Sequence, residues 1–307
     1  MGIPSLHADE VDGLPEAEVQ RLVRAAFGQL AAGRAAQPLQ VVTDLPDGGD
    51  VIAYQAVLAD SGVYAIKVSP YLPQAHGTPI VTAWTLLLSI RTGEPLLLVD
   101  SAALTTERTA ATTAIAVELL ARPGARTLAV IGLGKVGRAH LRHVRELGFT
   151  DIRVYAPRTT PADVADLRGV RRTDSAAEAV DGADVVLLCT SAAESVIDVA
   201  GLAPGTLVTS ISTNAPLARE IDPAALAALD VYADHAPAAF SAAGEMRIAA
   251  AEYGFTESDI RGDLAGLLSG RSPAPTGRRP VFFRSVGLGI EDAAVALAAL
   301  QHMEATS

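Results

Sequence analysis

The chain has 307 residues, half of them apolar, and its 24 basic and 35 acidic residues give a formal charge of −11. This is enough apolar surface for one large or two ordinary domains, so a folded enzyme-sized protein is expected. The acidic balance and the scarcity of aromatic residues argue against nucleic acid as a partner, and no apolar run reaches the about 18 residues of a membrane span. The start lacks the pattern of an export signal. Together with a single cysteine, Cys189, this predicts a cytoplasmic protein without a structural metal site.

The first third of the chain predicts a helix followed by a small sheet. Apolar residues recur at three and four positions over residues 14–30, the spacing of an amphipathic helix. Short β-rich runs then alternate with turn signals, which predicts an antiparallel sheet of strands at 41–42, 51–58, 63–68, 81–90 and 96–99. The hydroxyls and acid at 105–108 precede a long apolar stretch. They predict a helix whose first turn contains Arg108.

From residue 128 onward, apolar strands alternate with helices. Strands are predicted at 128–131, 152–155, 185–189, 207–212, 231–233 and 281–283, and helices at 135–147, 176–180, 259–268 and 290–303. Strands and helices that alternate at this spacing are typical of a doubly wound parallel sheet. The predicted fold class is therefore α/β, of the Rossmann type.

The motif GLGKVG at residues 132–137 follows an apolar strand and opens a helix. Gly132 allows the tight turn, Gly134 lets the backbone approach a pyrophosphate, and Gly137 lets the helix pack on the strand. The backbone N–H groups at Lys135 and Val136 begin the helix, where partial positive charge favours phosphate. A glycine turn without a ligand is the alternative, which the strand–turn–helix setting disfavours. We predict a dinucleotide site here.

The end of the second strand predicts which dinucleotide is bound. A cofactor without a 2′-phosphate usually meets an acid there, whereas this chain has Arg158 and Thr159. We therefore predict NADP(H) in preference to NAD(H), which remains possible; a solvated loop arginine is the alternative for Arg158. Thr190 and Ser212, at the ends of two later strands, are predicted as further cofactor contacts.

Three polar residues are candidates for the chemistry. Lys67 lies in an apolar strand, where a lysine either points to water or holds an anion. Arg108 in a first helical turn would oppose the helix dipole, so an anionic ligand would relieve it, although a plain surface arginine is the alternative. Asn214 follows a strand at the carboxyl edge of the parallel sheet, where ligands bind, or it caps the turn before Pro216.

Several segments together resemble the ornithine cyclodeaminase and mu-crystallin superfamily. The likeness runs from about residue 63 to Asp292; it includes the block LTTERTAA at 104–111, the glycine turn, REID at 219–222 and SVG at 285–287. The resemblance implies a homodimer and two domains. Residues 1–122 with 280–307 form a substrate and dimerisation domain completed by the C-terminal helix, and residues 123–279 form the Rossmann domain. It also implies a small amino or imino acid beside the nicotinamide, its carboxylate bound by Lys67 and Arg108, and we add Thr82 as a further substrate contact.

One residue departs from the family pattern. Asn214 stands where cyclodeaminases carry the aspartate that serves deamination, and an amide cannot accept a proton at neutral pH. The leading hypothesis is therefore an NAD(P)H-dependent oxidoreductase acting on the C=N or CH–NH bond of an imino or amino acid, with Lys67, Arg108 and Asn214 in its active site. The alternatives are an ornithine or lysine cyclodeaminase with bound NAD, and an NADPH-gated small-ligand binding protein of mu-crystallin type.

Overall fold

The computed structural model describes residues 3–7, 13–46, 48–74, 76–212 and 217–306. The chain divides into two compact units, one of residues 1–112 with 287–307 and the other of residues 113–286. The sequence placed boundaries after residues 122 and 279. In the structure the first boundary falls inside helix α2 (Ala102–Leu120), where no turn signal marks it. Among the described helices, none is long and apolar enough to cross a membrane.

The unit formed by both chain ends is built on a mixed sheet. Its elements are β1 (Ser5–Leu6), α1 (Glu16–Ala31), β2 (Ala35–Ala36), β3 (Val41–Asp44), β4 (Asp50–Leu58), β5 (Val63–Leu72), β6 (Ile80–Val81), β7 (Trp84–Ser89), β8 (Pro95–Asp100), the start of α2, and α8 (Gly289–Thr306). The strand order is β1-β8-β7-β5-β4-β2, with β3 also on β4 and β6 on β5. The predicted antiparallel pairing of 41–99 is confirmed. Strand β1, which the sequence did not predict, pairs with β8 in parallel.

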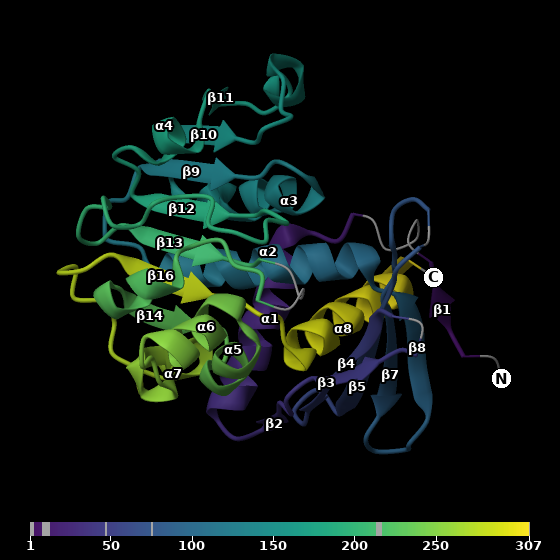
Figure 1. Ribbon diagram of the computed structural model, residues 1–307. Coiled ribbons are helices and arrows are strands. Elements are labelled where there is room, and N and C mark those ends of the chain that lie inside the picture. Colours follow the sequence, from purple (N-terminus) through teal and green to yellow (C-terminus); the bar gives the residue numbers. More distant parts are fainter. Residues whose placement is uncertain (1–2, 8–12, 47, 75, 213–216, 307) are drawn as a thin grey trace. The chain divides into compact units, whose positions relative to one another are not determined.

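One face of this sheet is covered by α8, and α1 packs on α8 (Figure 1). The alternation in β5 shows why: Val63, Ala65 and Lys67 are buried, whereas Val68 is exposed. Side chains on a strand point to opposite faces in turn, so Lys67 belongs to the face that packs on other elements. The expectation that a strand lysine on its own would point to water is wrong here.

Helix α2 begins earlier than the hydroxyl-rich segment predicted. It starts at Ala102, whose backbone N–H donates to the side chain of Asp100 at 3.0 Å. A carboxylate two residues ahead therefore caps the helix in place of the hydroxyls of 105–106. Arg108 consequently lies beyond the first turn, and the predicted opposition between its charge and the helix dipole does not apply to it.

The second unit is a doubly wound parallel sheet, as predicted. Its strands are β9 (Thr127–Ile131), β10 (Asp151–Tyr155), β11 (Val170–Arg172), β12 (Val185–Leu188), β13 (Leu207–Ser210), β14 (Asp230–Ala233), β15 (Ile260–Asp263) and β16 (Val281–Arg284). Their order is β11-β10-β9-β12-β13-β16-β14-β15, and every pairing is parallel (Figure 1). From β9 to β11 successive strands are added on one side of β9, and from β12 onward they are added on its other side. Ligands are therefore expected at the carboxyl ends of β9 and β12.

The helices of this unit are α3 (Lys135–Val144), α4 (Ala176–Val180), α5 (Ala236–Ala242), α6 (Gly244–Glu252) and α7 (Leu264–Leu268), together with the end of α2. The sequence missed α5 and α6 and predicted one helix over 259–268. The first half of that segment is strand β15, which pairs with β14, and Asp263 then caps α7. Pairing with a neighbouring strand overrides local helix propensity in this segment.

Candidate active site

Two glycines of the turn between β9 and α3 cannot be replaced by another residue without strain. Gly132 has a positive φ of 98°, and a Cβ there would lie 2.4 Å from the Cys189 carbonyl oxygen. A Cβ on Gly137 would lie 2.0 Å from the carbonyl oxygen of Gly132. Both positions therefore require glycine for packing, as the motif predicted.

Gly134 is different, because nothing lies within 4 Å of the Cβ it would carry. It is the N-cap of α3, and no side chain caps this helix among the described residues. The first N–H groups of α3, beginning at Lys135 and Val136, therefore have no capping side chain in the described part of the chain, and the positive end of the helix dipole lies at these residues. This arrangement fits a pyrophosphate.

A cleft of about 900 Å³ opens over this turn. All the predicted cofactor contacts but one line this cleft: Gly132, Gly134, Lys135, Val136, Arg158, Thr159, Thr190 and Ser212. The exception is Gly137, which packs beneath the turn. The cleft extends along the carboxyl ends of β10, β9, β12 and β13. This is the crevice at which the strand order reverses.

The β10 end of the cleft is basic. Arg158 is exposed in a turn that the Thr159 N–H closes on the Ala156 carbonyl at 3.0 Å. Arg172 also donates to the Thr159 carbonyl, at 2.9 Å. Arg138 lines the cleft as well, and its guanidinium donates to the backbone carbonyl of Asp163 at 2.7 Å. The sequence identified Arg158 but missed Arg138 and Arg172, because only the folded sheet brings them to this end.

In the other unit, Lys67 is almost completely buried. Its Nζ donates to Asp292 Oδ1 at 2.9 Å and lies 4.3 Å from the centroid of the Tyr54 ring. Burial lowers the pKa of Lys67 from 10.5 to about 8; Asp292 acts against this shift, and the nearby charge of Arg108 adds to it. A buried ammonium with this pKa can both bind an anion and release a proton near neutral pH.

Arg108 joins the same buried cluster. It donates to Glu291 Oε2 at 3.0 Å, and its Nε lies 3.2 Å from Asp292 Oδ1. Gly287, with φ 81°, passes so close that a Cβ would lie 2.4 Å from the guanidinium. The SVG segment therefore packs directly against the arginine. The alternative of a plain surface arginine is wrong, and the charges of Lys67 and Arg108 are balanced by two carboxylates of α8.

The structure does not assign a role to the two remaining predicted residues, Thr82 and Asn214. Thr82 is exposed, and its carbonyl accepts from Ser69 Oγ at 3.2 Å. In the sheet register Lys67 lies opposite Tyr54 on β4 and Thr85 on β7, and the Thr85 hydroxyl accepts from Ser101 Oγ at 2.5 Å. The substrate role of Thr82 therefore stays a prediction. Asn214 lies outside the described residues.

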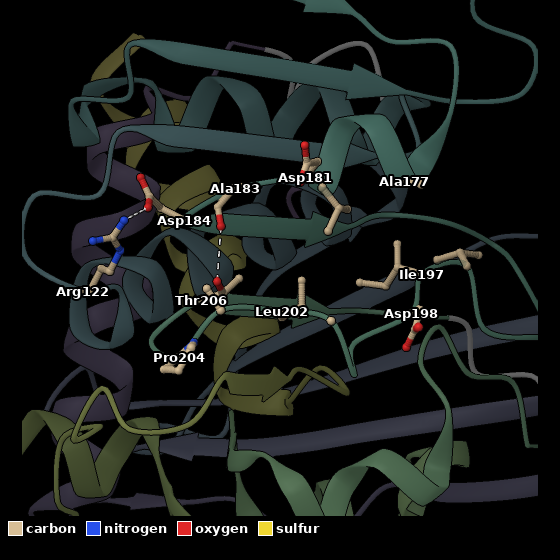
Figure 2. A pocket seen from close by; sticks show the side chains of 15 residues that line it. Arg122, Ala177, Asp181, Ala183, Asp184, Ile197, Asp198, Leu202, Pro204 and Thr206 are labelled. Atoms are coloured by element: carbon tan, nitrogen blue, oxygen red, sulfur yellow. Dashed lines mark hydrogen bonds and ion pairs between the residues drawn. The ribbon is translucent and has the colours of Figure 1, made fainter.

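A second cavity in the Rossmann unit, of about 700 Å³, reaches the amino ends of β12 and β13 (Figure 2). Asp184 accepts from the backbone N–H groups of Arg126 and Thr127 and pairs with Arg122. Thr206 Oγ1 donates to the Ala183 carbonyl at 3.3 Å. These bonds join loops to one another. Cofactors of parallel sheets bind at the carboxyl ends, so we place none in this cavity.

Comparison with known proteins identifies the family of the chain. The model of the ornithine cyclodeaminase/mu-crystallin family matches residues 9–306. The chain belongs to this family. The resemblance seen in the sequence is thereby confirmed, and so is the Rossmann-type α/β fold.

Two relatives in this family show what its members do. The chain is 50% identical over 289 residues to the NAD(P)H-dependent anabolic L-arginine dehydrogenase DauB of Pseudomonas aeruginosa, covering 92% of this chain and 91% of the relative. It is 30% identical to the ketimine reductase mu-crystallin of Mus musculus, covering 70% and 67%.

Two solved structures are similar to this chain along nearly its whole length. The Thermococcus litoralis Δ1-pyrroline-2-carboxylate reductase, in complex with NADH and L-proline, has a TM-score of 0.91 at 27% identity and covers 99% of this chain and 98% of its own. An archaeal alanine dehydrogenase dimer with bound NAD has a TM-score of 0.90 at 26% identity, covering 100% and 97%.

Proposed function

We propose that this chain is an NAD(P)H-dependent oxidoreductase that interconverts an imino acid and an amino acid, with L-arginine as the amino acid. The observation that carries the proposal is the 50% identity to an anabolic L-arginine dehydrogenase over nearly the full length of both chains. The glycine turn and the Lys67 and Arg108 cluster support it, because they supply a dinucleotide cleft and buried cations for a carboxylate.

In the proposed mechanism, Arg108 and Lys67 bind the substrate carboxylate and so fix the orientation of the α-carbon. The nicotinamide, when bound, supplies a hydride for that carbon. Lys67 or a water molecule beside it donates the proton that the nitrogen needs, and Asn214 orients the imine. An asparagine cannot act as the base that cyclodeamination requires, which favours reduction over ring closure.

The pKa of Lys67 predicts how substrate binding changes with pH. The ammonium predominates below its pKa of about 8 and is lost as the pH rises through that value. Because Lys67 binds the substrate carboxylate, we expect the substrate KM to be constant below this pKa and to rise by up to about tenfold per pH unit above it. In Lys67→Arg, whose charge persists, the alkaline rise should disappear. An alkaline rise that remains in Lys67→Arg would assign the titration to another group.

We propose NADP(H) as the preferred cofactor because Arg158 and Thr159 occupy the β10 end of the cleft, where an acid would favour NAD(H). Replacing Arg158 by glutamine should weaken NADPH binding by about ten- to a hundredfold and leave NADH binding within about twofold, since only NADPH carries the phosphate. Calorimetric titration measures both constants. Arg168→Gln, at an exposed position that does not line the cleft, is the matched control. An equal loss for both cofactors would contradict the assignment.

We further propose a cytoplasmic homodimer. The single cysteine is buried and suits a reducing compartment. The β3, β5 and β6 region exposes a set of large apolar side chains that a second copy could cover: Leu39, Val41, Val42, Val68, Tyr71, Ile80 and Val81. Sedimentation equilibrium should give twice the chain mass, and Val81→Glu should shift the protein toward the monomer.

The reaction itself is tested by following NADPH absorbance with three substrates. These are the 2-oxo acid of L-arginine with ammonia, pyruvate with ammonia, and pyrroline-2-carboxylate. We expect kcat/KM for the first to exceed the others by about tenfold or more. Faster reduction of pyrroline-2-carboxylate would move the proposal to a cyclic substrate. Ammonia release from ornithine without net NADPH change would replace it with cyclodeamination, and NADPH binding without any turnover would favour a binding protein.

A further inference from the structure

Glu220 carries a fully buried carboxylate in the Rossmann unit, and it accepts four hydrogen bonds. Oε1 accepts from the backbone N–H and the hydroxyl of Thr190, at 2.8 and 2.7 Å. Oε2 accepts from Ser210 Oγ at 2.7 Å and from the Ser212 N–H at 2.9 Å. Burying a carboxylate is costly, and this one is stabilised by donors from the carboxyl ends of two strands.

Two of these partners, Thr190 and Ser212, line the dinucleotide cleft. Thr190 follows β12 and Ser212 follows β13, so the carboxylate joins the two segments at which these strands end. Ser212 has a positive φ of 45°, which is unfavourable for a residue with a side chain. The bond from its N–H to Glu220 compensates for part of that cost, so the conformation of Ser212 depends on this carboxylate.

A buried ion pair, Arg284 with Glu245, lies beside the same segment. Arg284 donates to the carbonyl of Ile211, which also lines the cleft, and its Nε lies 2.8 Å from Glu245 Oε1. Charged side chains therefore contact both residues: Arg284 donates to the Ile211 carbonyl, and Glu220 accepts from the Ser212 N–H.

The order of strands indicates which half of a dinucleotide this part of the cleft receives. Arg158, which suits an adenosine phosphate, follows β10, and the turn that suits the pyrophosphate follows β9. A dinucleotide that crosses the crevice therefore brings its nicotinamide half to the ends of β12 and β13. Thr190 and Ser212 are the residues there that Glu220 fixes.

We propose that Glu220 is a positioning residue that sets Thr190 and Ser212 to receive the nicotinamide half of the cofactor. This inference rests on the proposed function, because it takes the cleft to be a dinucleotide site. Glu220 touches neither the cofactor nor the substrate. It acts through the two residues that it fixes.

Glu220→Gln is the decisive variant because an amide cannot replace the carboxylate here. Each carboxylate oxygen accepts from a backbone N–H, so either orientation of the amide sets its NH₂ group against an N–H that cannot turn away. We expect NADPH binding to weaken by about ten- to a hundredfold. The Kd of 2′,5′-ADP, which lacks the nicotinamide half, should stay within about twofold.

The primary isotope effect on kcat with 4-deuterated NADPH adds a readout that a merely structural role would not move. It should increase in Glu220→Gln, because a misplaced nicotinamide slows hydride transfer. Asp222→Asn is the matched control: Asp222 is an exposed N-cap two residues away, and its side chain accepts from Ala224 N. The control should bind both ligands like the unchanged protein.

Ser210→Ala gives a second test if Glu220→Gln does not fold. Ser210 does not line the cleft, and its loss leaves both backbone N–H bonds to Glu220 in place. A smaller change in the same direction is expected, about threefold for NADPH with no change for 2′,5′-ADP. Equal losses for the two ligands, or no loss for either, would overturn the inference. Failure of the unchanged protein to bind NADPH would instead overturn the proposed function.

Discussion

Replacing Arg108 by methionine is expected to lower the free energy of unfolding by about 3–5 kcal/mol and to raise the KM of the substrate by about a hundredfold or more. The loss of stability follows because Glu291 and Asp292 are buried and lose their guanidinium partner. The loss of substrate binding follows because the remaining cluster carries more negative than positive charge. Urea denaturation measures the first effect and initial rates the second.

A double variant separates these two effects. Arg108→Met combined with Glu291→Gln removes one cation and one anion, so the buried cluster returns to charge balance. We expect much of the stability to return, because replacing a whole buried pair costs less than breaking it. The substrate KM should stay high. If KM returned to its original value with stability, Arg108 would be a structural residue and not a carboxylate ligand.

Replacing Gly134 by alanine is expected to abolish tight NADPH binding, with a loss of about a hundredfold or more, and to cost no more than about 1 kcal/mol of stability. The added methyl group meets no protein atom within 4 Å, and the residue has an ordinary φ of −74°. The methyl would stand where the pyrophosphate approaches the backbone. Calorimetry and urea denaturation measure the two quantities.

Gly137→Ala is the contrasting variant. Its Cβ would lie 2.0 Å from the Gly132 carbonyl oxygen, so the turn must shift, and we expect about 3 kcal/mol of lost stability together with lost binding. Gly201→Ala, also at an open position but outside the cleft, controls for the added methyl group. Unchanged NADPH binding in Gly134→Ala would show that no phosphate lies against this turn.

The sequence predicted the dinucleotide turn well because its signal is local. A strand, three glycines and a helix lie within a short segment, and each glycine has its own geometric requirement. The family resemblance likewise pointed to Lys67 and Arg108, which the structure places in one buried cluster. Their partners were not predicted: Asp292 lies 225 residues from Lys67, and no periodicity connects a strand lysine to a C-terminal helix.

The predicted helices were wrong where contacts with residues outside the segment override its local propensity. Hydroxyls at 105–106 suggested a helix start, but Asp100 caps the helix further upstream. Residues 260–263 are apolar and charged in a helix-like pattern, yet they pair with β14. Glu220 was noticed only as part of a motif. Its role depends on two strand ends that come together in the folded sheet.

The most direct test of hydride transfer to an imino acid uses NADPH deuterated at both C4 positions, the 2-oxo acid of L-arginine and ammonia. Mass spectrometry of the amino acid product then shows where the label has gone. The proposed function predicts L-arginine with one deuterium at the α-carbon. NADPH consumption without deuterium in the amino acid, or the absence of arginine altogether, would contradict it.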